Sequence, residues 1–135
     1  MESSLNANSR RALAGAVLLI VEDNYLLLMD LEEVLLDAGA DRVESCRTIE
    51  DALRLCETDG LSAAILDVRI GADSIAPVAQ KLAARGTPFI FYTGQIGNDP
   101  MMTEWPKCRT ISKPAQPQFI VKAVAELLRV EPAQQ

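Results

Sequence analysis

The sequence contains no histidine among its 135 residues. Histidine can therefore serve neither as a zinc ligand, nor as a general base, nor as a phosphorylated side chain in this chain. Basic residues are also few, with 13 Lys and Arg against 19 Asp and Glu and a net charge of −6. Because binding to DNA or RNA needs a concentrated basic surface, we expect no nucleic-acid partner.

Cysteines are scarce and widely spaced, at Cys46, Cys56 and Cys108. Three thiols cannot all pair, and no C-x-x-C spacing indicates a metal site, so we expect reduced cysteines and a cytoplasmic location. No run approaches the roughly 18 apolar residues that a membrane-spanning helix needs, so we expect no membrane partner. Ser9-Arg10-Arg11 resembles the start of a twin-arginine export signal, but no small-residue cleavage site follows it.

Length and composition favour one compact domain. Hydrophobic residues make up 49% of the chain and charged residues 24%, which is ordinary for a globular protein. We interpret residues 1–14 as a polar N-terminal tail, residues 15–131 as the domain and residues 132–135 as a C-terminal tail.

Short apolar runs alternate with longer stretches of helical periodicity, which predicts βα units and a parallel sheet in an α/β fold. The predicted strands cover residues 17–21, 42–46, 62–66, 89–92 and 109–111. Helical patterns cover residues 27–38, 48–58 with Thr48 as N-cap, 74–85, and the stretch that begins at Pro117. Glycines and prolines interrupt residues 94–106, so we expect a loop, or a shortened and irregular helix, there.

Chemically active side chains follow four of the predicted strands. Glu22 and Asp23 follow the first strand, Asp67 the third, Thr93 the fourth and Lys113 the fifth. In an open parallel sheet, ligands bind outside the carboxyl ends of the strands. We therefore expect three carboxylates, one hydroxyl and one amine to meet at a single edge of the sheet.

Four short segments carry a resemblance to a known family. They are Val21-Glu22-Asp23-Asn24, Ile65-Leu66-Asp67-Val68, Phe91-Tyr92-Thr93-Gly94 and Ser112-Lys113-Pro114. In order and spacing they resemble the receiver domains of two-component response regulators, such as the chemotaxis receiver, over about residues 15–130. The resemblance implies a (βα)5 doubly wound sheet of five parallel strands in the flavodoxin-like order 2-1-3-4-5.

The resemblance also implies that Asp67 is a phosphoacceptor. Its carboxylate would attack the phosphorus of a phosphohistidine on a sensor histidine kinase or a phosphotransfer protein. Glu22, Asp23 and Asp67, with the backbone carbonyl of Arg69, would hold Mg²⁺, which prefers a few carboxylates plus water. In this family the domain promotes its own phosphorylation and dephosphorylation but is not otherwise an enzyme.

Two further residues complete the site that the resemblance implies. Lys113 would supply a fixed positive charge to the phosphoryl oxygens, and a cis peptide bond to Pro114 would hold it in place. The hydroxyl of Thr93 would turn toward the phosphoryl group and couple the modification to the loop that follows.

The sequence departs from the family pattern at several positions. Thr110 stands where many receivers carry an aromatic side chain, and Ala115 replaces the usual aromatic after Lys-Pro. The segment Phe91–Gly94 and the irregular fourth helix resemble the stand-alone alphaproteobacterial receivers of the FAT GUY type. Tyr92 occupies the position that is Ala in that signature.

Two side chains near the site invite separate hypotheses. The resemblance implies that the Arg69 side chain points near the phosphoryl group, where we hypothesise that it stabilises charge or obstructs the hydrolytic water. Trp105, in an otherwise polar loop, is either an anchor for a partner protein or a core residue.

We therefore interpret the chain as a single-domain response regulator that signals by contact with an unidentified downstream protein or by onward phosphotransfer. Two alternatives remain open. One is a pseudo-receiver, a binding module that is never phosphorylated. The presence of all five expected site residues argues against it, but Thr110 and the irregular helix keep it open. The other is a Mg²⁺-dependent phosphatase with an aspartate nucleophile, but Arg69 stands where such enzymes generally need a second acid.

Overall fold

The computed structural model describes residues 9–94 and 103–129, and its central element is a five-stranded parallel sheet. The strands are β1 (Val17–Val21), β2 (Arg42–Cys46), β3 (Ala63–Leu66), β6 (Phe89–Thr93) and β7 (Thr110–Ser112). Their order is β2-β1-β3-β6-β7, and each neighbouring pair is parallel. The predicted α/β fold with strand order 2-1-3-4-5 is therefore confirmed.

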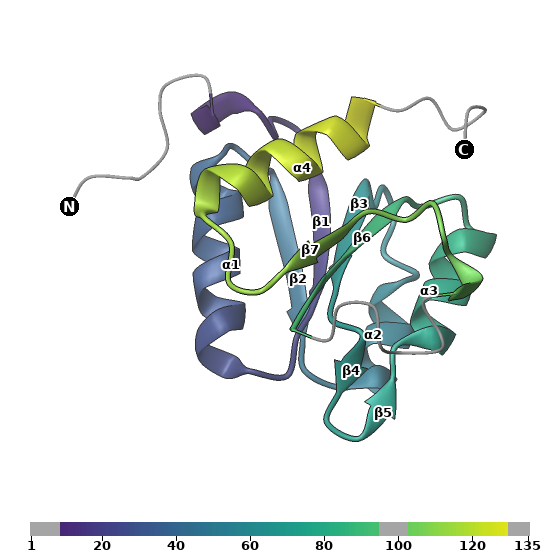
Figure 1. Cartoon of the computed structure of the whole chain (residues 1–135). Coiled ribbons are helices and arrows are strands. Elements are labelled where there is room, and N and C mark those ends of the chain that lie inside the picture. The colour runs from purple at the N-terminus through teal and green to yellow at the C-terminus, as the bar shows by residue number, and fades with distance from the viewer. Residues whose placement is uncertain (1–8, 95–102, 130–135) are drawn as a thin grey trace.

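Four α-helices cover the two faces of the sheet (Figure 1). The helices are α1 (Tyr25–Asp37), α2 (Ile49–Leu55), α3 (Ala76–Ala84) and α4 (Pro117–Arg129). One apolar cluster joins α1 and α4 to the sheet, and a second joins α2 and α3 to the opposite face. Because β1 is buried on both faces, it reads as a continuous apolar run.

Short polar side chains begin the first two helices. The Asn24 side chain accepts a hydrogen bond from the Leu27 amide at 3.1 Å, and Thr48 accepts one from the Asp51 amide at 3.1 Å. Each satisfies a backbone donor that the first helical turn leaves without an intrahelical partner. The predicted Thr48 cap is confirmed.

Two predicted helices are shorter in the structure. α2 ends at Leu55, three residues before the predicted end at Thr58. α3 begins at Ala76 because Ser74 belongs to a small antiparallel hairpin formed by β4 (Arg69–Ile70) and β5 (Asp73–Ser74). Strands of two residues leave no periodic signal in a sequence, so this hairpin was not predicted.

The N-terminal segment packs on the domain more closely than a polar tail would. Residues Ser9–Arg11 form a 3₁₀ turn, and Leu13 is fully buried in the cluster beneath α1 and α4. The Leu13 amide donates to the Ala38 carbonyl at 3.0 Å. The folded part of the chain thus includes residues on the N-terminal side of the predicted boundary at residue 15.

The segment between β6 and β7 is described only in part, since residues 95–102 lie outside the described residues. From residue 103 to the start of β7 the structure contains no α-helix. Trp105 packs edge-on against Phe89 and Phe91, with ring centroids 6.1 and 6.5 Å away. Of the two hypotheses for Trp105, the structure supports the core position. Across both described ranges, no helix has the length and apolar character needed to cross a bilayer.

Candidate functional site

The predicted site residues lie together at the carboxyl edge of the sheet. Glu22 follows β1, Asp67 follows β3, Thr93 ends β6 and Lys113 follows β7. The backbone ladder continues into these residues. The Glu22 amide donates to the Cys46 carbonyl at 3.1 Å, the Asp67 amide to Val21 at 3.0 Å, and the Lys113 amide to Thr93 at 3.1 Å. Hydrogen bonding within the sheet therefore fixes the backbone position of each of these residues.

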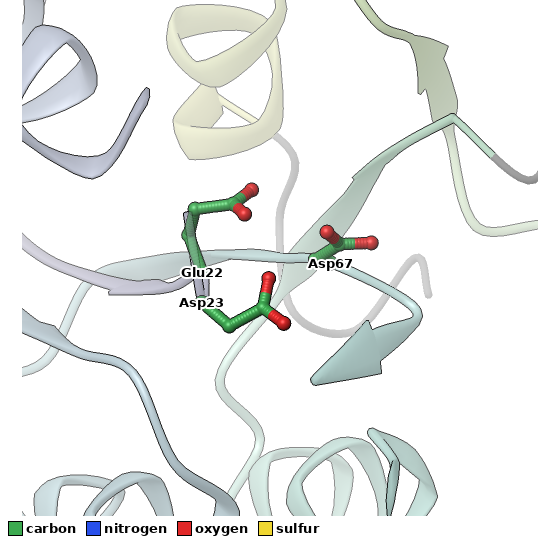
Figure 2. Close-up of side chains that lie close together, drawn as sticks. All are labelled: Glu22, Asp23 and Asp67. Carbon is green, nitrogen blue, oxygen red and sulfur yellow. The ribbon is translucent and has the colours of Figure 1, made fainter. Parts of the chain in front are cut away.

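Three carboxylates gather in one small region at this edge (Figure 2). One oxygen from each of Glu22, Asp23 and Asp67 lies within 4.8 Å of the other two. Glu22 is only 2% exposed and Asp67 8%, whereas Asp23 is the most open of the three. Like charges this close repel one another in a poorly solvated site, so the cluster needs a cation.

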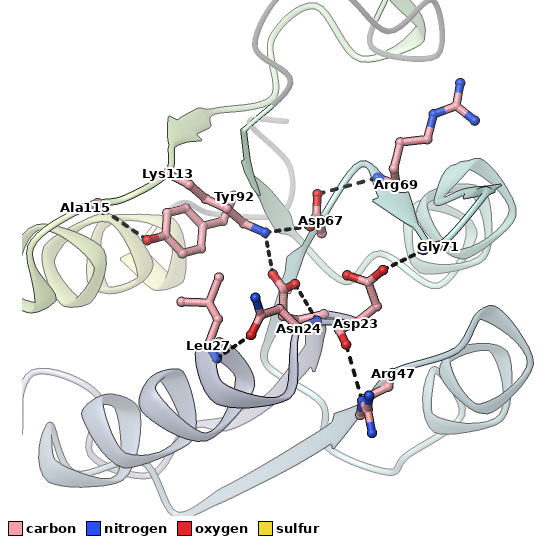
Figure 3. A network of polar contacts seen from close by, with 11 residues as sticks. Asp23, Asn24, Leu27, Arg47, Asp67, Arg69, Gly71, Tyr92, Lys113 and Ala115 are labelled. Atoms are coloured by element: carbon pink, nitrogen blue, oxygen red, sulfur yellow. Dashed lines mark hydrogen bonds and ion pairs between the residues drawn. The ribbon is translucent and has the colours of Figure 1, made fainter.

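Lys113 supplies one positive charge to this cluster (Figure 3). Its Nζ lies 2.6 Å from Asp67 Oδ2 and 2.7 Å from Glu22 Oε1. These are short, charge-assisted hydrogen bonds. The peptide bond between Lys113 and Pro114 is cis, as predicted.

Burial and pairing act in opposite directions on this ion network. Burial raises the pKa of Glu22, and hydrogen bonds from Lys113 and the Asn24 amide only partly offset that effect. Burial disfavours the charge on Lys113, but hydrogen bonds to Asp67 and Glu22 outweigh it and raise the pKa of Lys113. Lys113 is therefore held as a cation between the two buried carboxyl groups.

Backbone groups and one arginine fix the segment that carries Glu22 and Asp23. The Asn24 amide donates to Glu22 Oε2 at 3.0 Å, and the Gly71 amide, at the tip of the β4–β5 hairpin, donates to Asp23 Oδ2 at 2.7 Å. Arg47 Nε donates to the Asp23 carbonyl at 3.3 Å. Sequence reasoning missed all three contacts. Asn24 lies in the segment Val21–Asn24 that resembles the receiver family, but nothing in the sequence links Gly71 or Arg47 to Asp23.

The donor set fits a hard divalent cation such as Mg²⁺. All the available ligands are carboxylate oxygens, and three carboxylates face a single ammonium group, which leaves an excess of negative charge. Softer metals favour thiolate or imidazole ligands, and this cluster offers neither.

Arg69 is placed beside Asp67, but its side chain is directed elsewhere. Its amide donates to Asp67 Oδ1 at 3.5 Å, and Figure 3 shows the guanidinium group turned away from the three carboxylates. This orientation disagrees with the hypothesis that the Arg69 side chain faces the phosphoryl position. The Arg69 carbonyl as a metal ligand stays a prediction.

Tyr92 is a further residue that the sequence marked only as a departure from a family pattern. It is 3% exposed, and its ring centroid lies 5.9 Å from the Nζ of Lys113. Its hydroxyl oxygen accepts a hydrogen bond from the Ala115 amide at 3.0 Å. In the sequence, the position of Tyr92 directly before Thr93, at the end of a predicted strand, was the only indication that Tyr92 lies close to the site.

The chain matches no family model and no curated protein. It is similar in structure to a CheY-like response regulator receiver domain protein from Methanospirillum hungatei JF-1, with 22% identity, coverage of 85% of this chain and 94% of that one, and a TM-score of 0.74. It is also similar to the non-phosphorylated HemR receiver domain from Leptospira biflexa, with 23% identity, coverage of 86% of this chain and 96% of that one, and a TM-score of 0.75. A third similar structure is a response regulator receiver protein from Sinorhizobium medicae WSM419, with 21% identity, coverage of 86% of this chain and 96% of that one, and a TM-score of 0.76. At these identities the likeness shows that the chain has the fold of receiver domains.

Proposed function

We propose that this chain, which has the receiver fold, accepts a phosphoryl group on Asp67 with the help of Mg²⁺ and acts as a response regulator. One observation carries the proposal. A single lysine contacts two of three clustered carboxylates at the edge of the sheet where ligands bind in doubly wound folds. A cation and a set of metal ligands around one aspartate are the elements that phosphoryl transfer needs.

The chemistry assigns different tasks to the two oxygens of Asp67. Oδ2 is held by Lys113 at 2.6 Å, whereas Oδ1 has only a long contact of 3.5 Å with the Arg69 amide. Oδ1 is thus the better placed nucleophile. It attacks the phosphorus of a phosphohistidine, an O–P bond forms while the P–N bond breaks, and the electron pair leaves with the imidazole nitrogen. The product is an acyl phosphate on Asp67.

Glu22, Asp23 and Asp67 are the residues that would hold Mg²⁺. When bound, the ion neutralises charge on the phosphoryl oxygens as the transfer proceeds. Asp23 would be fixed for this task by the Gly71 amide and Glu22 by the Asn24 amide. The Arg69 carbonyl is the fourth protein ligand in this proposal.

Thr93 and Lys113 respond to the added group. Lys113 moves its hydrogen bonds from the Asp67 carboxylate to the new phosphoryl oxygens. Thr93, fully buried at the end of β6, donates its hydroxyl hydrogen to the same group. Because the chain leaves the sheet directly after Thr93, this contact biases the conformation of the following segment.

Exposed apolar side chains beside the site support a protein as the phosphoryl donor. Leu26 and Met29, near the start of α1, are 73% and 46% exposed. Large apolar side chains in water next to a polar site are typical of a surface that docks another protein. A sensor histidine kinase or phosphotransfer protein would cover them, and a second, downstream protein would read the phosphorylated form. We extend the proposal to the FAT GUY subgroup of receivers, which the segment Phe91–Gly94 and the interrupted pattern of residues 94–106 resemble.

Labelling with a small phosphoryl donor tests the proposal. Wild-type protein incubated with acetyl phosphate and Mg²⁺ should gain the mass of one phosphoryl group, and EDTA should prevent it. Asp67→Asn should abolish the adduct. Asp73→Asn, an exposed position in the nearby β4–β5 hairpin, is the matched control and should label like the wild type.

Two other outcomes would contradict the proposal. A folded wild-type protein that never gains the adduct in Mg²⁺ is a pseudo-receiver, a binding module without phosphorylation. Continuous release of inorganic phosphate from a phosphomonoester, lost in Asp67→Asn, would assign the site to an aspartate-dependent phosphatase instead.

A further inference from the structure

Tyr92 makes two contacts that connect the site with the start of α4. Its ring centroid lies 5.9 Å from Lys113 Nζ, and its hydroxyl oxygen accepts from the Ala115 amide at 3.0 Å. Ala115 lies in the short connection between β7 and α4, and α4 begins at Pro117. Figure 3 shows Tyr92 between the Lys113 ammonium group and Ala115.

Burial makes both contacts specific. Tyr92 is 3% exposed and belongs to the apolar cluster beneath α1 and α4. A buried tyrosine hydroxyl keeps a hydrogen-bond partner, and here the partner is a backbone amide that cannot rotate away. The ring lies 5.9 Å from the same Lys113 ammonium group that pairs with Asp67 and Glu22.

We propose that Tyr92 is a positioning residue that sets the place of Lys113 and transmits its movement to the connection before α4. The proposal rests on the proposed function for the event that moves Lys113, namely the arrival of a phosphoryl group on Asp67. When the ammonium group shifts toward the phosphoryl oxygens, its contact with the Tyr92 ring changes. Tyr92 then adjusts, and the Ala115 amide that is bonded to its hydroxyl follows.

Backbone amide NMR of Tyr92→Phe tests the transmission step, because this substitution keeps the ring and removes only the hydroxyl acceptor. The probe is beryllofluoride with Mg²⁺, a phosphoryl mimic. In the wild type the amides of Arg69, beside Asp67, and of Ala115 should both shift. In Tyr92→Phe the Arg69 response should persist and the Ala115 response should be lost.

Two variants provide the controls. Tyr25→Phe alters the chain's other tyrosine, whose ring contacts Arg47 at 5.4 Å rather than Lys113, and it should keep both responses. Tyr92→Leu removes the ring, and we expect it to slow labelling of Asp67 by acetyl phosphate about two- to fivefold, the effect of losing a weak cation–π contact. A purely structural role for Tyr92 would lower the denaturant midpoint and leave the Ala115 response intact.

A second arm needs no phosphoryl group. Lys113→Met should shift the NMR signal of the Ala115 amide when Tyr92 is present, and should not shift it in a protein that also carries Tyr92→Phe. If Arg69 fails to respond to beryllofluoride in the wild type, the proposed function fails, and the lysine arm alone decides the role of Tyr92. An Ala115 shift of equal size in both backgrounds, in either arm, overturns the proposal for Tyr92.

Discussion

Lys113 is the residue on which the charge balance of the site depends. It pairs with Glu22, which is 2% exposed, and with Asp67, which is 8% exposed. Removing a carboxylate from water costs several kcal/mol unless an opposite charge and hydrogen bonds replace the lost solvation. The stability of the folded protein should therefore depend on the positive charge of Lys113, which a substitution can test.

Lys113→Met should destabilise the fold by about 2–3 kcal/mol, since it leaves two neighbouring carboxylates without their cation. We place the loss below the value for a fully buried pair because the Lys113 side chain is 21% exposed. Mg²⁺ should restore more stability to this variant than to the wild type, because a divalent cation replaces the missing charge.

Urea unfolding with and without Mg²⁺ measures both effects, with Lys122→Met, an exposed lysine on α4, as the control. If Lys113→Met and Lys122→Met unfold at the same urea concentration, Lys113 does not balance the charge of the cluster.

Cys108 should be a slow nucleophile although it is only partly buried. Burial raises its pKa to about 12, and its Sγ lies 3.3 Å from the Phe89 carbonyl oxygen. The reaction with iodoacetamide at pH 8 should be about a thousandfold slower than for an ordinary thiol, since only the thiolate reacts. A plateau in its rate near pH 9 would contradict this pKa; instead, the rate should keep rising up to about pH 11.

Mass spectrometry of the Cys108 peptide after timed alkylation gives the rate of its reaction with iodoacetamide.

The raised pKa of Cys108 also has a consequence for stability. Between the ordinary thiol pKa and about 12, the folded protein keeps a proton that the unfolded chain releases. The free energy of unfolding should therefore fall as the pH rises through this window.

At the scale of elements, the contact between the N-terminal segment and the end of α1 depends on a glycine. Gly39 follows α1 with φ of +98°, and a Cβ there would lie 2.9 Å from the Arg10 carbonyl oxygen. Gly60 also has a positive φ, of +74°, but a Cβ there would meet nothing within 4 Å. The two positions share the backbone cost of a side chain and differ only in the steric contact.

Gly60→Ala should cost about 1 kcal/mol, and Gly39→Ala about 2–3 kcal/mol, because only the second adds a clash with backbone. Denaturant unfolding of the two variants side by side measures the difference. Equal losses would show that residues 9–14 do not pack tightly against the end of α1 in solution.

The sequence predicts the larger elements well and the smaller ones poorly, for physical reasons. A strand buried on both faces must be apolar throughout, so the run Val17–Val21 is evident without coordinates. The hairpin at residues 69–74 is held by two backbone pairs and by an amide contact to Asp23, which depend on loop geometry rather than on side-chain pattern. The burial of Leu13 was not predicted, because Leu13 precedes the predicted strand in a segment with neither helix nor strand periodicity.

At the scale of the whole molecule, the candidate site is assembled at one edge of the sheet from four strands that lie far apart in the sequence. Parallel pairing places the ends of β1, β3, β6 and β7 side by side, so the convergence of the predicted residues follows from topology. The sequence could therefore predict that these residues lie together at one edge. It could not predict that Gly71 and Arg47 contact Asp23 or that the Tyr92 ring contacts Lys113, because these contacts come from loops and packing.

The most direct test of the account is the location of the phosphoryl group. An acyl phosphate formed with acetyl phosphate and Mg²⁺ can be reduced with borohydride, which converts the modified aspartate to homoserine, and peptide mass spectrometry then identifies the position. We expect homoserine at position 67 and unchanged residues at positions 22 and 23. Homoserine at position 23, or reduction at no residue of a folded and Mg²⁺-loaded protein, would contradict the account.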